Sequence, residues 1–348
     1  MTWLNHCCAL GLAGALACGE RGTVYEGEYV TLIVDPALEP CGDMAGHMNR
    51  VVGTLVDYLG VSLPDGPFSY IWYSEERFAV ESSCGVWTGP CESEGVIQST
   101  SPFADATLVR LVLALVGSPP LFFQAGALVV FTPGAGSFTE SFYPYSAGDV
   151  QQLLASRQLN YWLSGGFTRF LIDRHGLEAY LAFYASVGEK DPLPVIEAAY
   201  AAQFGESLTE TELAFFAEHH WCPARSFRLF ECSAPSIAWD GDALLLRRSL
   251  ACGEDDVVGP FEDGTARILS TLEVETAGTY EISLAADEQA GMLLGGCGGC
   301  EDDTEVWLAV GQEPVRQWLP AGRYYLHLGG DAEAATELAL RIERVDEP

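Results

Sequence analysis

The spacing of apolar and polar residues changes once along this chain, near residue 222. Before that point, short apolar runs typical of strands alternate with segments of helical periodicity. The predicted elements are strands 30–34, 68–73, 77–81 and 95–99, and helices 43–59, 104–116 and 120–131. Residues 149–220 have the pattern of several further helices, separated by Gly and Pro.

Beyond Cys222-Pro223 the period becomes two, which is typical of strands with one buried face. The alternating segments are 243–250, 266–274, 279–284, 306–310, 323–328 and 337–342. Turn dipeptides such as Asp240-Gly241 separate them. The pattern predicts an α+β protein in which a mixed domain, 29–222, is followed by an antiparallel β-sandwich, 226–345.

The first residues have the pattern of an export signal. Residues 1–18 contain a short apolar run that ends in Leu12-Ala13-Gly14-Ala15-Leu16-Ala17-Cys18, which resembles a bacterial lipobox. The run is too short to span a bilayer as a helix. We expect Cys18 to be lipidated and 19–28 to form a tether, with simple cleavage after Ala17 as the alternative. The protein would then be lipid-anchored in the cell envelope or outside the cell, or else secreted and soluble.

The chain has 11 cysteines, and eight remain once Cys7, Cys8 and Cys18 are set aside. An even number of this size suits an oxidising compartment. Neighbouring positions suggest a set of pairs, although eight cysteines allow 105 connectivities. The predicted pairs are Cys84–Cys91, Cys232–Cys252, Cys297–Cys300 and Cys41–Cys222. The Cys297/Cys300 pair also has the spacing of a redox motif or half a zinc site, but its glycine-rich turn favours a structural bond.

The charge is strongly negative, with 17 Lys+Arg against 49 Asp+Glu and a net charge of -32. Such a surface repels nucleic acid and offers no basic patch for anionic lipid. It favours a solubilising role, with a cationic partner as the alternative. The acidic runs 254–256 and 301–303 leave calcium in the sandwich loops open, although a solvated loop face is favoured because their carboxylates are contiguous.

The two apolar helices carry the segment on which the functional interpretation depends. The first reads Ala106-Thr107-Leu108-Val109-Arg110, and the second reads Gln124-Ala125-Gly126-Ala127. With the element order around them, from about 29 to 220, these segments resemble the gluzincin-type zinc metallopeptidases of the peptidase MA clan. Segments 161–176 and 199–208 resemble the helices that follow the site in that family.

The resemblance implies a zincin-like domain, in which a small mixed sheet packs with helices. The family binds zinc through His-Glu-x-x-His on the first apolar helix and a Glu on the second. Here Ala106 and Arg110 occupy the histidine positions, Thr107 that of the catalytic Glu and Ala125 that of the third ligand. Alanine has no donor atom, threonine is neutral and arginine stays protonated. We therefore expect no zinc, no other cofactor and no enzymatic activity.

The expected function is binding by a catalytically inactive, metallopeptidase-like exported lipoprotein. A peptide or protein would occupy the former cleft, for which Arg110, Tyr161 and Trp162 are the candidate binding residues. Arg110 would pair with Glu140 or Asp105, or extend to the mouth of the cleft. The alternatives are a hydrolase that uses an unrecognised site and a structural envelope lipoprotein.

Two further features bear on these alternatives. His219 and His220 adjoin Cys222 and would form a metal patch, but neighbouring residues on a helix point about 100° apart, which disfavours joint ligation. The segments 277–284 and 319–328 resemble β-domains appended to bacterial exoproteases. That resemblance implies binding or adhesion by the sandwich.

Overall fold

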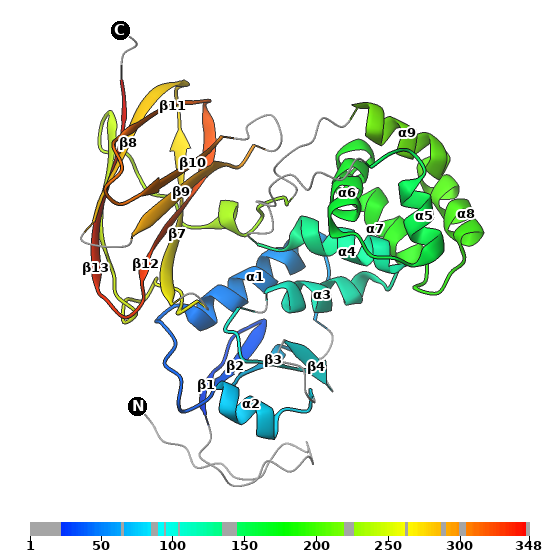
Figure 1. The fold of residues 1–348 in the computed structure, drawn as a ribbon, viewed down its shortest axis with the longest axis horizontal. Coiled ribbons are helices and arrows are strands. Elements are labelled where there is room, and N and C mark those ends of the chain that lie inside the picture. Colours follow the sequence, from blue (N-terminus) through cyan, green and yellow to red (C-terminus); the bar gives the residue numbers. More distant parts are fainter. Residues whose placement is uncertain are drawn as a thin grey trace.

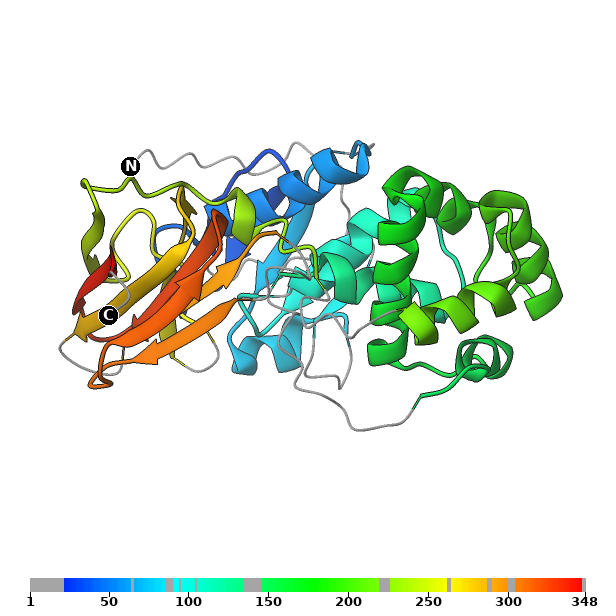
Figure 2. The ribbon, with the colours of Figure 1, turned by 90° about the horizontal axis from the view of Figure 1, so that it is seen from above.

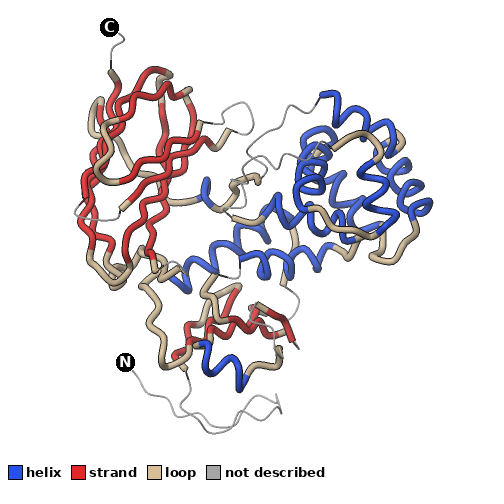
Figure 3. The backbone as a smooth tube through the Cα atoms, in the orientation of Figure 1, coloured by secondary structure: helices blue, strands red, loops and turns tan. Residues whose placement is uncertain are grey.

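The computed structural model describes residues 22–63, 66–84, 90–93, 95–103, 105–133, 145–218, 226–261, 264–286, 290–298 and 304–345. Its mixture of nine described helices longer than one turn and three described sheets confirms the predicted α+β class. A large strand region, a smaller sheet and a helical region can be distinguished, and helices also lie between the two strand regions (Figure 3). The predicted signal, Cys18, Glu140, His219, His220, Cys222 and Cys300 lie outside the described residues.

A five-stranded mixed sheet forms the base of the N-terminal part. Its strands are β1 (Thr23–Tyr25), β2 (Val30–Val34), β3 (Phe68–Trp72), β4 (Cys91–Ser93) and β5 (Val96–Ser99), in the order β1-β2-β3-β5-β4. The central pairs are parallel, and both edge strands are antiparallel to their neighbours. The predicted tether is therefore corrected, because its residues 23–25 pair with β2 as an edge strand.

Two helices lie over this sheet (Figure 1). They are α1 (Met44–Leu59) and α3 (Asp105–Val116). Met48, Val52 and Leu108 are buried with the strand residues Val30 and Leu32 in one core. The apolar stripe of α1 and one face of α3 thus cover the sheet, while the other side of α3 is exposed.

The predicted strand 77–81 is wrong, because this segment is helix α2 (Glu75–Glu81). The side-chain oxygen of Ser74 accepts a hydrogen bond from the Arg77 backbone N–H, which caps the helix. Arg77 also pairs with Glu81 one turn later, at 2.8 Å. The Ser74 cap and the Arg77–Glu81 pair therefore favour a helix more strongly than the short alternation of apolar residues favours a strand.

The rest of the N-terminal part is helical and lies at the end of the molecule opposite the β-sandwich (Figure 2). Its helices are α4 (Leu121–Phe131), α5 (Asp149–Ser156), α6 (Tyr161–His175), α7 (Leu177–Ser186), α8 (Leu193–Phe204) and α9 (Leu208–Glu218). Helices α4 and α6 approach closely, since Gly126 faces the Ser164 backbone oxygen and Gly165 faces Val129. Phe122, Phe123, Phe167 and Phe183 fill the core between these helices.

The C-terminal part is a sandwich of two four-stranded antiparallel sheets. Their orders are β10-β9-β12-β7 and β11-β8-β13-β6. The strands are β6 (Ala243–Leu250), β7 (Thr265–Val274), β8 (Gly278–Ala286), β9 (Gly291–Gly296), β10 (Glu305–Ala309), β11 (Val315–Leu319), β12 (Gly322–Asp331) and β13 (Thr336–Arg344). All six predicted strands are present, whereas β9 and β11 were not predicted.

Three disulfide bonds are described, and only one of them follows the predicted pairing. Cys84–Cys91 is confirmed. Cys41 pairs with Cys252, and Cys232 pairs with Cys297, so the predicted partners of these four cysteines are wrong. Sequence proximity fails here because the fold places the start of α1 against the loop after β6. The bonds fit a secreted or extracellular protein.

The junction between the two parts contains a cluster of aromatic rings and a set of backbone hydrogen bonds. The ring of His47, on α1, packs edge-on against Phe103 and Phe230, and Phe103 stacks on Phe261 at 3.8 Å. The backbone N–H groups of Cys41, Gly42 and Asp43 donate to carbonyl oxygens of Gly259, Cys252 and Val257. The start of α1 is therefore tied to the sandwich by hydrogen bonds and by the Cys41–Cys252 disulfide.

None of the described helices is long and apolar enough to cross a membrane.

Candidate functional site

A hollow of about 230 Å³ lies where α3, α4 and α7 meet the start of α6. Its apolar wall includes Leu113, Leu121 and Leu128, and polar groups come from Arg110, Gln124 and Tyr184. The volume is smaller than the roughly 300–1,000 Å³ typical of pockets that enclose a drug-sized ligand. It therefore suits one or two side chains of a larger ligand.

The structure brings together three of the residues singled out from the sequence. Arg110 from α3, Ala125 from α4 and Tyr161 from the start of α6 all line this hollow. Ala106 is exposed on α3 and lies outside the lining, and Thr107 is buried and also lies outside it. Trp162 is half-buried and also lies outside the lining.

Arg110 is exposed at the hollow and makes no hydrogen bond or ion pair to any residue of the described ranges. The predicted pairing with Asp105 is wrong, because Asp105 lies 3.4 Å from His47 Nε2 on the other side of α3. Its other predicted partner, Glu140, lies outside the described residues. The guanidinium at the hollow thus keeps its hydrogen-bond donors available toward solvent.

Two polar side chains of the wall, Gln124 and Tyr184, differ in whether they have a hydrogen-bond partner. Gln124 is held in place, because its Nε2 donates to the Pro119 carbonyl oxygen at 2.7 Å. Tyr184 is 2% exposed and lines the hollow, and its hydroxyl has no hydrogen-bond partner among the described residues. Burial raises the pKa of Tyr184, so that its hydroxyl is protonated and remains a donor at neutral pH.

The donor set does not fit a zinc ion. None of the described residues that line the hollow is a His, Cys, Asp or Glu. Zinc sites in proteins take three or four such ligands, and a guanidinium beside the site would repel a dication. Nowhere in the described ranges do three His, Cys, Asp or Glu side chains gather closely enough to hold a metal ion.

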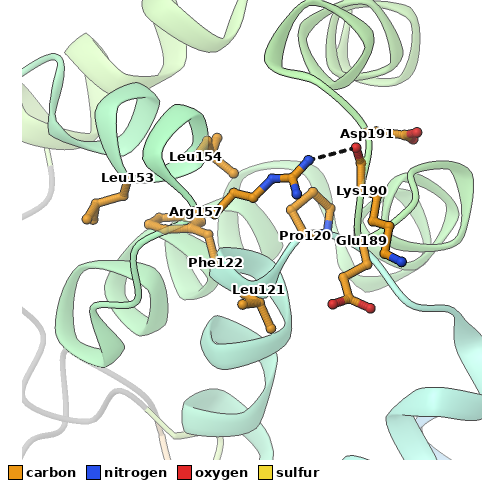
Figure 4. Close-up of a pocket in the computed structure, with 9 residues that line it drawn as sticks. All are labelled: Pro120, Leu121, Phe122, Leu153, Leu154, Arg157, Glu189, Lys190 and Asp191. Atoms are coloured by element: carbon orange, nitrogen blue, oxygen red, sulfur yellow. Dashed lines mark hydrogen bonds between the residues drawn. The ribbon is translucent and has the colours of Figure 1, made fainter.

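Two other hollows contain arginines, but there these side chains have partners. In the smaller one, of about 80 Å³, Arg157 donates to the Lys190 carbonyl oxygen at 3.1 Å (Figure 4). The third, of about 310 Å³, contains Arg169 and Arg228. Arg169 binds Asp173 at 2.8 Å, and Arg228 donates to the Gly296 carbonyl oxygen at 3.1 Å. Among these four arginines, Arg110 alone lacks a partner in the described parts of the chain.

Sequence patterns did not indicate Gln124 or Tyr184 as residues of the site. Gln124 is the neighbour of Ala125 and follows from the same helix, but its hydrogen bond to Pro119 depends on the geometry of the helix start. Tyr184 lies on α7, about 60 residues beyond α4, and reaches the site only through tertiary packing. Its four-residue spacing from Tyr180 was a signal of a buried helix face, without indicating which hollow that face lines.

No family model matches this chain, and no curated protein matches it. Among solved structures it is similar to the pre-peptidase C-terminal domain of a collagenase from Bacillus anthracis, with 19% identity over 32% of this chain and 95% of that one, at a TM-score of 0.23. It is also similar to aminopeptidase A of Legionella pneumophila, with 11% identity over 92% of this chain and a TM-score of 0.34. The chain spans 37% of the length of that aminopeptidase. At these scores the likenesses establish neither a family nor an activity for this chain.

Proposed function

We propose that this protein is an exported, non-catalytic binding protein with a zincin-like N-terminal domain. It holds a segment of a peptide in the hollow between α3, α4 and the start of α6. The observation that carries the proposal is the lining itself, in which Arg110 and Ala125 take the positions of the second histidine and of the third zinc ligand in the resemblance described above. Its described lining offers a guanidinium and apolar walls that can hold a ligand, but no His, Asp or Glu that could act as a general base.

Several features support binding as the role of this site. Leu121, Leu159 and Tyr161 are each more than 40% exposed around the hollow, so an apolar surface remains uncovered in a chain that is otherwise strongly acidic. Exposed apolar surface rimmed by polar groups is typical of interaction sites. Export through the N-terminal segment, with an anchor at Cys18, belongs to the same proposal and is supported by the disulfide bonds.

The absence of catalysis is tested by metal analysis and a peptidase assay on the purified full chain. We expect less than stoichiometric zinc after incubation with the metal, and no cleavage of a mixed peptide library. As a positive reference, a variant with Ala106→His, Thr107→Glu, Arg110→His and Ala125→Glu should gain zinc affinity if the alignment is correct. Stoichiometric zinc in the unaltered protein, with cleavage that a chelator abolishes, would overturn the proposal.

Peptide binding is tested by filling or stripping the hollow. Ala125→Leu adds three carbons to a side chain that is 4% exposed, and Tyr161→Ser removes a ring that is 49% exposed. Both changes should weaken binding of library peptides, measured by fluorescence anisotropy, and Tyr161→Ser should leave folding intact. Ala198→Leu, on the exposed side of α8, is the matched control. A spacer protein would bind no peptide in any of these forms.

A further inference from the structure

The hollow combines one unpaired cation with an apolar wall. Arg110 has no partner among the described residues, and Tyr184, a side chain that is 2% exposed, also lines the hollow. The remaining wall is contributed mainly by Leu113, Leu121 and Leu128. A ligand that satisfies these groups must therefore bring a hydrogen-bond acceptor for the guanidinium and an apolar group beside it.

We infer that the hollow binds a carboxylate that is carried next to a large apolar group, with Arg110 as the residue that recognises the charge. This inference rests on the proposed function and names the chemistry of its ligand. The guanidinium presents N–H donors in a fork that matches the two oxygens of a carboxylate. Tyr184 supplies a further O–H donor on the enclosed side, and the leucines contact the apolar group.

The charge of the site favours a carboxylate over a phosphate. One guanidinium balances a single negative charge, whereas a phosphate monoester carries about −1.5 to −2 at pH 7. No second cation lines the hollow among the described residues. The surplus charge of a phosphate would face a chain with a net charge of -32 without a partner.

The overall negative charge does not prevent a carboxylate from binding at this place. At physiological ionic strength, charges in water are screened beyond about 8 Å. A guanidinium and a carboxylate in direct contact lie about 2.8 Å apart, well within that distance. The local pair therefore decides affinity, and the distant acidic surface mainly slows the approach of an anionic ligand.

The test compares four probes by isothermal titration calorimetry with the full chain. They are an N-acetylated tripeptide ending in leucine with a free carboxylate, its C-terminal amide, an amidated tripeptide with aspartate before leucine, and decanoate. In the unaltered protein the free acid should bind about 10- to 100-fold more tightly than the amide, the range expected for hydrogen bonds to charged groups. The aspartyl peptide and decanoate show whether a side chain or a fatty acid can supply the carboxylate.

Arg110→Gln should remove the preference for the acid, so that the free acid and the amide bind with similar affinity. Arg247→Gln, an exposed arginine on β6, removes the same charge elsewhere and should change nothing. Equal binding of acid and amide in the unaltered protein, with both blocked by Ala125→Leu, would reject the carboxylate and keep peptide binding. If none of the four probes binds, both this inference and the proposed function fail.

Discussion

At the scale of single residues, the burial of His327 in the sandwich determines its protonation. It lies on β12, its Nε2 is enclosed without a hydrogen-bond partner among the described residues, and its ring lies 5.2 Å from that of Tyr325. Burial lowers the pKa of His327 to about 4, and the positive charges of Arg267, His47 and Arg228 act in the same direction. The folded protein therefore keeps this imidazole neutral at mildly acidic pH.

This shift predicts a loss of stability on acidification. Between pH 6.5 and about 4 the unfolded chain takes up a proton at His327 that the folded chain does not. The contribution of His327 to the free energy of unfolding is thus greatest above pH 6.5 and falls by about 3 kcal/mol as the pH approaches 4. Urea denaturation at pH 7 and pH 4.5 should show a smaller difference in His327→Gln than in the unaltered protein. His175→Gln is the control. If the free energy of unfolding changed equally between the two pH values in all three forms, the prediction would be contradicted.

At the scale of elements, the sequence predicted the strongly periodic segments well. Helices α3 and α4 and the long strands of the sandwich begin and end within a few residues of the predicted bounds. The failures were short or glycine-rich elements, such as β9, whose Gly291, Gly295 and Gly296 resemble a turn. The sequence predicted that Arg110 lies near Ala125, because both residues are on neighbouring apolar helices. The position of Tyr184 and the long-range disulfides depend on tertiary contacts that no local pattern encodes.

Helices α4 and α6 depend on a glycine at their closest approach. A Cβ added at Gly126 would lie 2.5 Å from the Ser164 carbonyl oxygen, which belongs to a backbone that cannot move alone. A Cβ at Gly166, two residues beyond Ser164 on α6, would meet Phe215 of α9 at an ordinary 3.5 Å. Gly126 therefore lies at the tight contact of α4 with α6, whereas Gly166 lies at the looser contact of α6 with α9.

The contrast predicts opposite effects of the same substitution. Gly126→Ala should lower the free energy of unfolding by about 1–3 kcal/mol, because overpacking forces the helices apart. Gly166→Ala should leave it unchanged or raise it by up to about 1 kcal/mol, because alanine favours the helix. Denaturant titrations followed by circular dichroism measure both. A neutral Gly126→Ala would mean that α4 and α6 can separate freely.

At the scale of the whole molecule, a disulfide bond joins the sandwich to the N-terminal part. Cys41 is 2% exposed and joins the start of α1 to Cys252, across 211 residues of chain. Cys84–Cys91 closes only seven residues beside β4. In the chain-entropy model a bond that closes a longer loop restricts the unfolded chain more. The long-range bond therefore has the larger part in holding the two halves of the molecule in one arrangement.

Removing the two bonds separately tests this difference. The double variant Cys41→Ser/Cys252→Ser should lose about 5 kcal/mol of stability by the loop-length relation, and Cys84→Ser/Cys91→Ser clearly less, because its loop is short. The first variant should also become sensitive to proteases at 252–261, where the backbone of Cys41, Gly42 and Asp43 is bound. Binding at the hollow should survive, since none of the residues that line it contacts this bond. If the long-range variant were as stable and as protease-resistant as the short-loop variant, the hydrogen bonds and the stacked Phe103 and Phe261 would suffice to hold the halves together.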